Sequence, residues 1–232
     1  MPIELVMQHD AKLGAFAEWK NSDEIRENQN ASLMLVRSRG YGIGAGMVVG
    51  GKIIEGRLGI AGEVGHVGID YMESRTKSEI QGTLEFCAGS ESAVRYAKER
   101  LFEFPDSILN KKSTYQDLIK AYKAGDKLAC CAVDKMAWML GYGISNFVYM
   151  INPDCVIIGL DYPGDERFID NIKKVVSQRV DDVIWQNMEI RYSKLKIDSF
   201  LLGGYCYILE KLCREKVILE KIKEVIKHGL SN

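Results

Sequence analysis

The sequence lacks several features that would assign a protein to a class at once. Its 31 basic and 32 acidic side chains nearly cancel, so it has no basic excess of the kind that binding to a phosphate backbone requires. No apolar run reaches the roughly 20 residues that a membrane-spanning helix needs, and the amino terminus has no basic region followed by an apolar stretch. We therefore expect a cytoplasmic protein that contacts neither membrane nor DNA through this segment.

Metal and redox motifs built from cysteine are also absent. The chain has six cysteines, but no two have the C-x-x-C spacing of a thiolate metal site or a redox pair. Most lie in apolar runs, so we expect reduced cysteines packed as small hydrophobic residues, with Cys213 the most exposed. The sequence has no internal repeat and no Pro- or Gly-rich linker, and therefore indicates no domain boundary. With 232 residues, of which 47% are hydrophobic, the chain is long enough to bury a core.

Hydrophobic periodicity predicts an α/β protein. Short apolar runs between turn residues indicate strands, and apolar positions at helical spacing indicate helices. The first third is expected to be a β-meander with one interruption, a short helix. Its strands are predicted over residues 3–7, 32–36, 43–49 and 53–54, and its helix over residues 11–19.

From about residue 83 the pattern becomes helical. A long apolar helix is predicted over residues 127–150, ending before Asn152-Pro153. Strands and helices alternate after this stop, which favours parallel pairing with helices covering the sheet. The predicted elements are strands at 155–159 and 189–192, helices at 168–176 and 200–212, and an amphipathic tail helix at 215–228.

The densest motif is a run of alternating glycines over residues 40–46, Gly-Tyr-Gly-Ile-Gly-Ala-Gly. Alternate glycines leave one face of a strand bare, so that a ligand or another backbone can approach closely. On the first interpretation Gly42, Gly44 and Gly46 lie near a phosphate, which turn amides can face. A tight hairpin whose bare face is covered by packing explains the pattern equally well. No βαβ unit follows, so the run is not a dinucleotide fingerprint.

The next segment contains Gly56, Gly59 and the run Ala-Gly-Glu-Val-Gly-His over residues 61–66. Together with the hairpin it resembles the signature of the ROK family (repressor, open reading frame, kinase). The resemblance extends from residue 2 to about residue 212. It implies an α/β, ribonuclease H-like lobe of the hexokinase and actin superfamily, with a mixed sheet in which a β-meander is followed by helices and a β-α-β-α unit. It also implies that residues 1–232 are a single carboxy-terminal lobe, and we expect a preceding lobe and any DNA-binding domain to lie outside it.

The resemblance gives roles to five side chains. It implies that Glu63, His66 and Glu85 contact sugar hydroxyls, which suits carboxylates that accept protons and an imidazole that can donate or accept. Asp10 matches the aspartate that takes the sugar hydroxyl proton in the family's kinases, and His9 is expected beside it at the ligand. Purely structural roles fit the same residues: a helix N-cap for Asp10, an acid favoured by the helix dipole for Glu85, and a solvated pair on a turn for Glu63 and His66.

Two departures from the family pattern disfavour kinase chemistry. The family's Glu-Asn before the aspartate becomes Gln8-His9, so the asparagine that orients the base is gone. The glycine run expected after residue 158 stops at Gly159, with Leu160 and Asp161 following, which places side chains where an adenine ring needs bare backbone. We therefore expect ATP not to be a cofactor.

A third departure concerns zinc. The resemblance implies three cysteine ligands that act with the histidine of the Glu-x-Gly-His motif, but these positions are Thr76, Ser78 and Thr83. Hydroxyls do not replace thiolates at a structural zinc. We therefore expect no metal and a looser loop over residues 70–81.

Three functions fit these observations. The first, which we favour, is a sugar-sensing, dimerising effector domain of a ROK-type transcriptional regulator without kinase activity, which would reach DNA only through a domain outside this chain. The second is the carboxy-terminal lobe of an ATP-dependent hexose or N-acetylhexosamine kinase with Asp10 as base. The third is a ligand-free scaffold. The combined loss of base-orienting and adenosine residues should disable a kinase, whereas a repressor needs neither.

Overall fold

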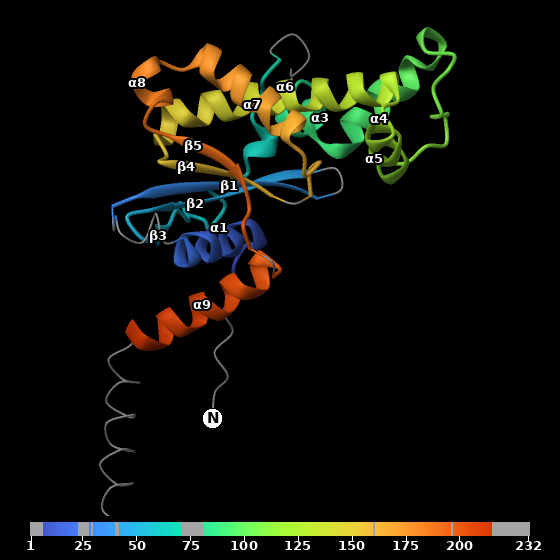
Figure 1. Cartoon of the computed structure of the whole chain (residues 1–232). Helices are drawn as coiled ribbons and strands as arrows, with labels where there is room; N and C mark the ends of the chain where they lie inside the picture. The colour runs from blue at the N-terminus through green and yellow to red at the C-terminus, as the bar shows by residue number, and fades with distance from the viewer. Residues whose placement is uncertain are drawn as a thin grey trace, which may run out of the picture.

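The structure, a computed structural model, describes residues 7–22, 28, 30–39, 42–70, 81–159, 161–195 and 197–214. This part of the chain forms one five-stranded sheet with helices on both faces (Figure 1). The strands, in the spatial order β3-β2-β1-β4-β5, are β1 (Ser32–Arg39), β2 (Gly42–Val49), β3 (Lys52–Ile53), β4 (Cys155–Ile158) and β5 (Glu189–Tyr192). The strand predicted over 3–7 falls almost wholly, and the tail helix over 215–228 wholly, outside the described residues.

The sheet is mixed, as the family resemblance implied, and its parallel part is the one that the alternating pattern predicted. β1 runs antiparallel to β2 and parallel to β4, and β4 runs parallel to β5. β1 continues to Arg39, three residues beyond its predicted end, because Arg37 and Ser38 pair with Gly44 and Ile43 of the hairpin. Because the side chains at this end of β1 are polar, a prediction based on hydrophobic runs did not include these residues in the strand.

One face of the sheet carries the larger core. Its centre is α6 (Lys127–Ile151), which begins at the N-cap Asp126 and ends at Asn152, whose φ of 47° is left-handed. Pro153 then prevents continuation of the helix. The long predicted helix is therefore confirmed to within one residue. Around α6 lie α3 (Leu84–Ala88), α4 (Ser90–Glu99), α5 (Tyr115–Lys123), α7 (Glu166–Arg179) and α8 (Asp182–Trp185). The sequence placed α3, α4 and α5 only within a helical region that starts at about residue 83, and it did not predict α8.

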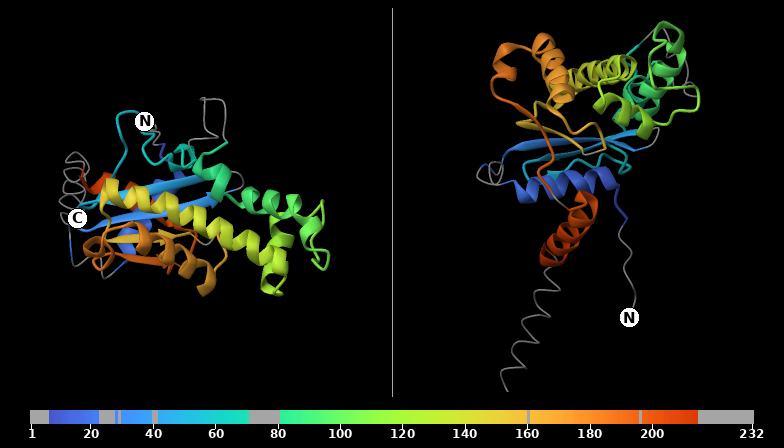
Figure 2. Two further views of the ribbon diagram at one scale, coloured as in Figure 1. Left: turned by 90° about the horizontal axis from the view of Figure 1, so that it is seen from above. Right: turned by 45° about the vertical axis from the view of Figure 1, so that its right-hand side comes forward.

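The other face is covered by α1 (Asp10–Asn21), and α9 (Ser199–Arg214) lies beyond it (Figure 2). Because α1 lies between the sheet and another helix, it is buried nearly all round, and even Lys12 and Glu18 are only 1% and 2% exposed. Gly203 of α9 allows this close packing, since a Cβ there would lie 1.8 Å from the carbonyl oxygen of Leu13.

A buried polar contact joins α1 to the end of β5. The hydroxyl of Ser193 donates a hydrogen bond to the carboxylate of Glu18, and Arg191 is nearby. Burial raises the pKa of Glu18, and the Ser193 hydrogen bond and the charge of Arg191 offset this only in part. The contact therefore holds α1 against the end of β5, although burial of the Glu18 carboxylate is itself unfavourable.

Two other expectations can be compared with the described residues. Within them, no helix is both long and apolar enough to cross a membrane. All six cysteines lie in the described residues and none forms a disulfide; Cys213 is exposed as predicted. Cys131 is exposed as well, because it lies on the outward face of α6. Its exposure was not predicted, since the residues around it in the sequence are mostly apolar.

Candidate functional site

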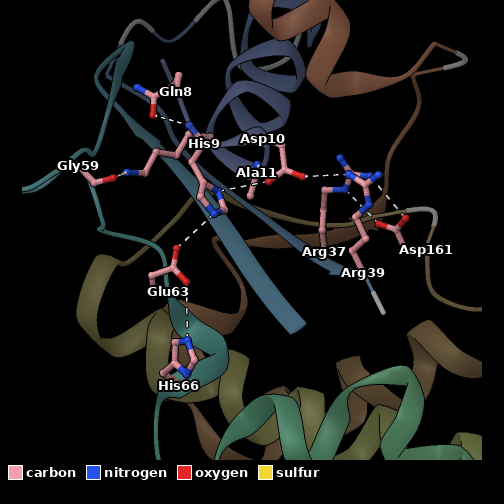
Figure 3. Close-up of polar contacts among 11 residues, drawn as sticks. Gln8, His9, Asp10, Ala11, Arg37, Arg39, Gly59, Glu63, His66 and Asp161 are labelled. Carbon is pink, nitrogen blue, oxygen red and sulfur yellow. Dashed lines mark hydrogen bonds and ion pairs between the residues drawn. The ribbon is translucent and has the colours of Figure 1, made fainter. Parts of the chain in front are cut away.

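Five side chains that the sequence assigned to a ligand lie close together in the structure. His9 Nε2 lies 3.2 Å from Glu63 Oε1, and His9 Nδ1 lies 3.3 Å from Asp10 Oδ1 (Figure 3). His66 Nε2 lies 4.0 Å from Glu63 Oε2, and its Nδ1 lies 3.5 Å from Glu85 Oε1. We call this group the polar corner; its members are His9, Asp10, Glu63, His66 and Glu85.

The glycines of the Gly-Glu-Val-Gly-His run place the polar corner against β2. Gly62 has a φ of 100°, and a Cβ there would lie 2.1 Å from the carbonyl oxygen of Ala45. Ala45 N donates to Gly62 O at 2.9 Å, which fixes the chain against the strand. Gly65 likewise packs closely against β2, because a Cβ there would lie 2.4 Å from the carbonyl oxygen of Ile43. It would also lie 2.8 Å from Glu85 Oε2. Glu63 is the N-cap of the turn η1 (Val64–His66), which brings His66 Nε2 to 4.0 Å from Glu63 Oε2.

The polar corner is open to solvent. The side chains of His9, Asp10 and Glu63 are 41%, 42% and 43% exposed, His66 is 66% exposed, and Glu85 is the most covered at 15%. Two imidazoles and three carboxylates therefore present both donors and acceptors on one surface. This mixture suits a neutral ligand with several hydroxyl groups better than an anion, which the three carboxylates would repel.

Asp10 lies in the first turn of α1, one residue after the N-cap position that the structural interpretation gave it. The helix starts at Asp10, and the N-cap position is His9, whose side chain makes no capping bond. Asp10 Oδ1 accepts a hydrogen bond from Ala11 N at 2.7 Å, and its Oδ2 lies 3.6 Å from Arg39 Nη1. Arg39 was not identified from the sequence, because its place beside Asp10 depends on the extra length of β1.

The bare glycine face of β2 serves two purposes. At Gly46 a Cβ would lie 2.1 Å from the carbonyl oxygen of Ala11, so this glycine is covered by α1. At Gly44 the nearest atoms to such a Cβ are Ala11 Cβ at 3.6 Å and His9 Cε1 at 3.7 Å, and at Gly42 the nearest is Glu85 Oε2 at 3.8 Å. Packing thus explains Gly46, whereas Gly42 and Gly44 border the polar corner. Their role near a phosphate stays a prediction.

Comparison with known proteins decides the family. The sequence model of the ROK family matches residues 1–211, most of the chain. The chain belongs to the ROK family. Among its relatives, the xylose repressor of Caldicellulosiruptor bescii is 28% identical over 223 residues, which cover 90% of this chain and 53% of that protein. The glucokinase of Halalkalibacterium halodurans is 28% identical over 214 residues, which cover 87% of this chain and 62% of that protein.

Solved structures of ROK proteins share the fold. The ROK family glucokinase of Streptomyces griseus, in complex with glucose and AMPPNP, matches with a TM-score of 0.71 at 24% identity, over 85% of this chain and 66% of that one. A ROK family transcriptional regulator, homologous to the Escherichia coli MLC protein, matches with a TM-score of 0.70 at 23% identity, over 85% of this chain and 51% of that one. The predicted hexokinase-like α/β fold is confirmed. This ROK chain spans about half to two thirds of the length of these relatives.

Of the three positions at which the resemblance implies zinc ligands, Thr83 lies in the described residues. Thr83 is the N-cap of α3, and its side chain accepts a hydrogen bond from Phe86 N at 3.4 Å. Glu85 follows in the first turn of α3, where the helix dipole favours an acid. Its position therefore fits both the expected contact with a sugar and a purely structural role. Thr76, Ser78 and most of the loop expected to be looser lie outside the described residues. The absence of zinc stays a prediction, based on hydroxyls as poor zinc ligands.

A second polar feature of this ROK chain lies at the carboxyl ends of the parallel strands. Arg37 Nε lies 3.0 Å from Asp161 Oδ2. Burial would lower the pKa of Arg37, but the hydrogen bond and charge of Asp161 raise it above its usual value. The pair borders a cavity of about 340 Å³, the strand-end cavity, formed by the ends of β1, β4 and β5 and the start of α9. Asp198 also lines it, so two carboxylates face it with one guanidinium.

Proposed function

We propose that this ROK chain is the sugar-binding, dimerising effector domain of a cytoplasmic transcriptional regulator that has no kinase activity. The observation that supports it most is the polar corner, in which every side chain assigned to the sugar lies within 4.0 Å of another. DNA would be bound by a domain outside this chain, since the nearly balanced charge of the chain offers no basic surface excess.

The polar corner has the chemistry that sugar recognition needs. Glu63 lies between His9 and His66, so its two oxygens can accept from neighbouring hydroxyls while the imidazoles donate. Glu85 lies deeper and is held by His66, which gives one end of the site a fixed acceptor. A hydroxyl-rich ligand replaces the water that covers these exposed groups and satisfies donors and acceptors together.

A regulator is favoured over an enzyme by the strand-end cavity. Ligands of α/β sheets commonly bind outside the carboxyl ends of parallel strands, but here the cavity at these ends is lined by Asp198 and by Asp161, which stands where the resemblance places an adenine ring. The ion pair with Asp161 also takes up the Nε and Nη2 groups of Arg37, whose guanidinium lines this cavity. Xylose repressors are among the relatives. A sugar would then shift the balance between two arrangements of the whole regulator and so its DNA affinity.

Calorimetric titration of the whole protein tests this proposal. Xylose, glucose and two N-acetylated hexosamines form the panel, and an ADP-release assay with Mg-ATP and each sugar follows. The proposal predicts that at least one sugar binds at micromolar affinity and that no sugar supports ADP release above the rate without sugar. ADP release with a sugar contradicts it. Failure of every sugar to bind favours the ligand-free scaffold instead.

A sugar kinase is the second candidate, and the position of Asp10 favours it. The carboxylate is 42% exposed at the polar corner, where it can reach a bound hydroxyl as a general base, and glucokinases are among the relatives. In that case Asp10→Asn abolishes turnover while sugar affinity changes little. Turnover that is unchanged in Asp10→Asn, or absent from the unaltered protein, removes this candidate.

A further inference from the structure

Lys12 is an unusual residue for the inside of a helix-sheet interface. It is 1% exposed, and its ammonium donates to two backbone carbonyls, Gly59 O at 2.6 Å and Glu55 O at 3.5 Å. Burying an ammonium is costly even when it is hydrogen-bonded, and an apolar side chain of similar volume often serves stability as well or better. A role in packing alone therefore does not account for a lysine at this position.

The two carbonyls belong to a loop that leads directly to the polar corner. Ala61 N donates to Glu55 O at 3.1 Å and closes residues 55–61 into a compact turn. Gly56 and Gly59 both have a φ of 71°, which turns the backbone so that the loop can fold back on itself. Glu63 comes two residues after this closure. The loop on one side and the hydrogen bond of Gly62 with Ala45 on the other thus set the position of Glu63.

The other half of the polar corner lies at the start of the helix that carries Lys12. Asp10 and His9 stand two and three residues before Lys12. The same loop is also joined to the residue that precedes them, because Gln8 Nε2 donates to Glu55 Oε1 at 2.9 Å and Gln8 Oε1 accepts from His9 N at 2.9 Å. The start of α1 and the loop are therefore held together by the side chains of both Gln8 and Lys12.

We infer that Lys12 is a positioning residue for the polar corner: its buried ammonium holds the loop over residues 55–61 against α1 and so fixes Glu63 relative to His9 and Asp10. This inference rests on the proposed sugar-binding function. A charged donor is suited to the task because it binds two carbonyls at once and each bond to an ionised donor is stronger than one between neutral groups. An uncharged side chain of the same length would fill the space and leave the loop free to shift.

The test replaces Lys12 by methionine, which nearly keeps the length and removes the charge. In the whole protein, Lys12→Met is expected to bind the sugar about tenfold or more weakly while its melting temperature stays unchanged or rises. Hydrogen exchange of the Ala61 amide should become faster, and exchange in α6 should not change. The matched control is Lys20→Met on the same helix, whose ammonium pairs with Glu210 of α9; its sugar affinity and Ala61 exchange should equal those of the unaltered protein.

The outcomes separate this inference from the function on which it rests. If the unaltered protein binds a sugar and Lys12→Met binds it equally well, the inference is wrong and the proposed function stands. If the unaltered protein binds no sugar of the panel, the proposed function fails, and Ala61 exchange then decides whether Lys12 holds the loop. Lys12→Gln, which keeps a neutral donor, takes the same measurements if Lys12→Met does not fold.

Discussion

The polar corner and the strand-end cavity border the same sheet but differ in what they offer a ligand. The polar corner presents two imidazoles and three carboxylates that are mostly open to solvent. At the strand-end cavity Arg37 and Asp161 are only 16% and 29% exposed and already neutralise each other. The first region presents its hydrogen-bonding groups to solvent, whereas in the second the guanidinium of Arg37 is paired with Asp161 and only its buried Nη1 has no partner. The difference favours a protein that recognises a hydroxyl-rich ligand without a nucleotide beside it.

The largest expected effect is on the free energy of unfolding. It distinguishes Gly46 of β2, which α1 covers, from Gly44, which borders the polar corner. Gly46→Ala places a Cβ 2.1 Å from a backbone oxygen of α1, which cannot move without displacing the helix, so we expect a loss of about 3 kcal/mol in the free energy of unfolding. Gly44→Ala meets only ordinary contacts at 3.6 Å and should change stability by less than about 0.5 kcal/mol. Urea denaturation of both variants measures this, and equal losses would show that Gly44 is a packing residue too.

The next effect concerns the polar corner alone. Glu63→Gln removes the charge that lies between two imidazoles and exchanges an acceptor for a donor, so sugar affinity in the whole protein should fall roughly a hundredfold. Stability should change little, because the side chain is 43% exposed. Glu103→Gln, at an exposed glutamate in the turn after α4, is the matched control for calorimetry. Unchanged affinity in Glu63→Gln would exclude the polar corner as the sugar site.

A smaller effect is expected at the strand-end cavity. Asp161→Asn leaves the guanidinium of Arg37 partly buried without its counter-charge, which should lower the free energy of unfolding by about 1 to 2 kcal/mol. Sugar affinity should stay the same, since Asp161 is not part of the polar corner. Urea denaturation and calorimetry on the same sample give both values. A tenfold loss of sugar affinity in this variant would show that the two regions act as one site.

The smallest effect concerns the contact between Glu18 and Ser193, which links α1 at the polar corner to the strand-end cavity. Glu18 lies on α1 with Asp10, and its partner Ser193 lines the strand-end cavity. Because burial raises the pKa of Glu18, the folded state binds its proton more tightly than the unfolded state does. Stability from this group should therefore decrease as pH rises from the ordinary value of 4.5 to the raised value, and stay lower above it. Glu18→Gln should remove this decrease in urea denaturation between about pH 4 and pH 7.

Periodicity and motif order were enough to predict the long helix α6, the strands β4 and β5 and the parallel pairing, because α6 and β4 are largely apolar and strands alternate with helices after them. The resemblance to ROK proteins was also enough to single out the five residues that the structure brings together at the polar corner; their contact with a ligand stays a prediction. The end of β1 was missed because Arg37 and Arg39 are polar residues inside a strand. Lys12 was missed because a lysine on a helix usually faces water, and its burial depends on the loop over residues 55–61, which packs against α1.

The most direct test is an ADP-release measurement on the whole protein, with Mg-ATP and a sugar that calorimetry has shown to bind. We predict binding that depends on Glu63 and an ADP-release rate no higher than that without sugar. Sugar-dependent ADP release that disappears in Asp10→Asn would contradict the proposed regulator and identify the chain as part of a kinase.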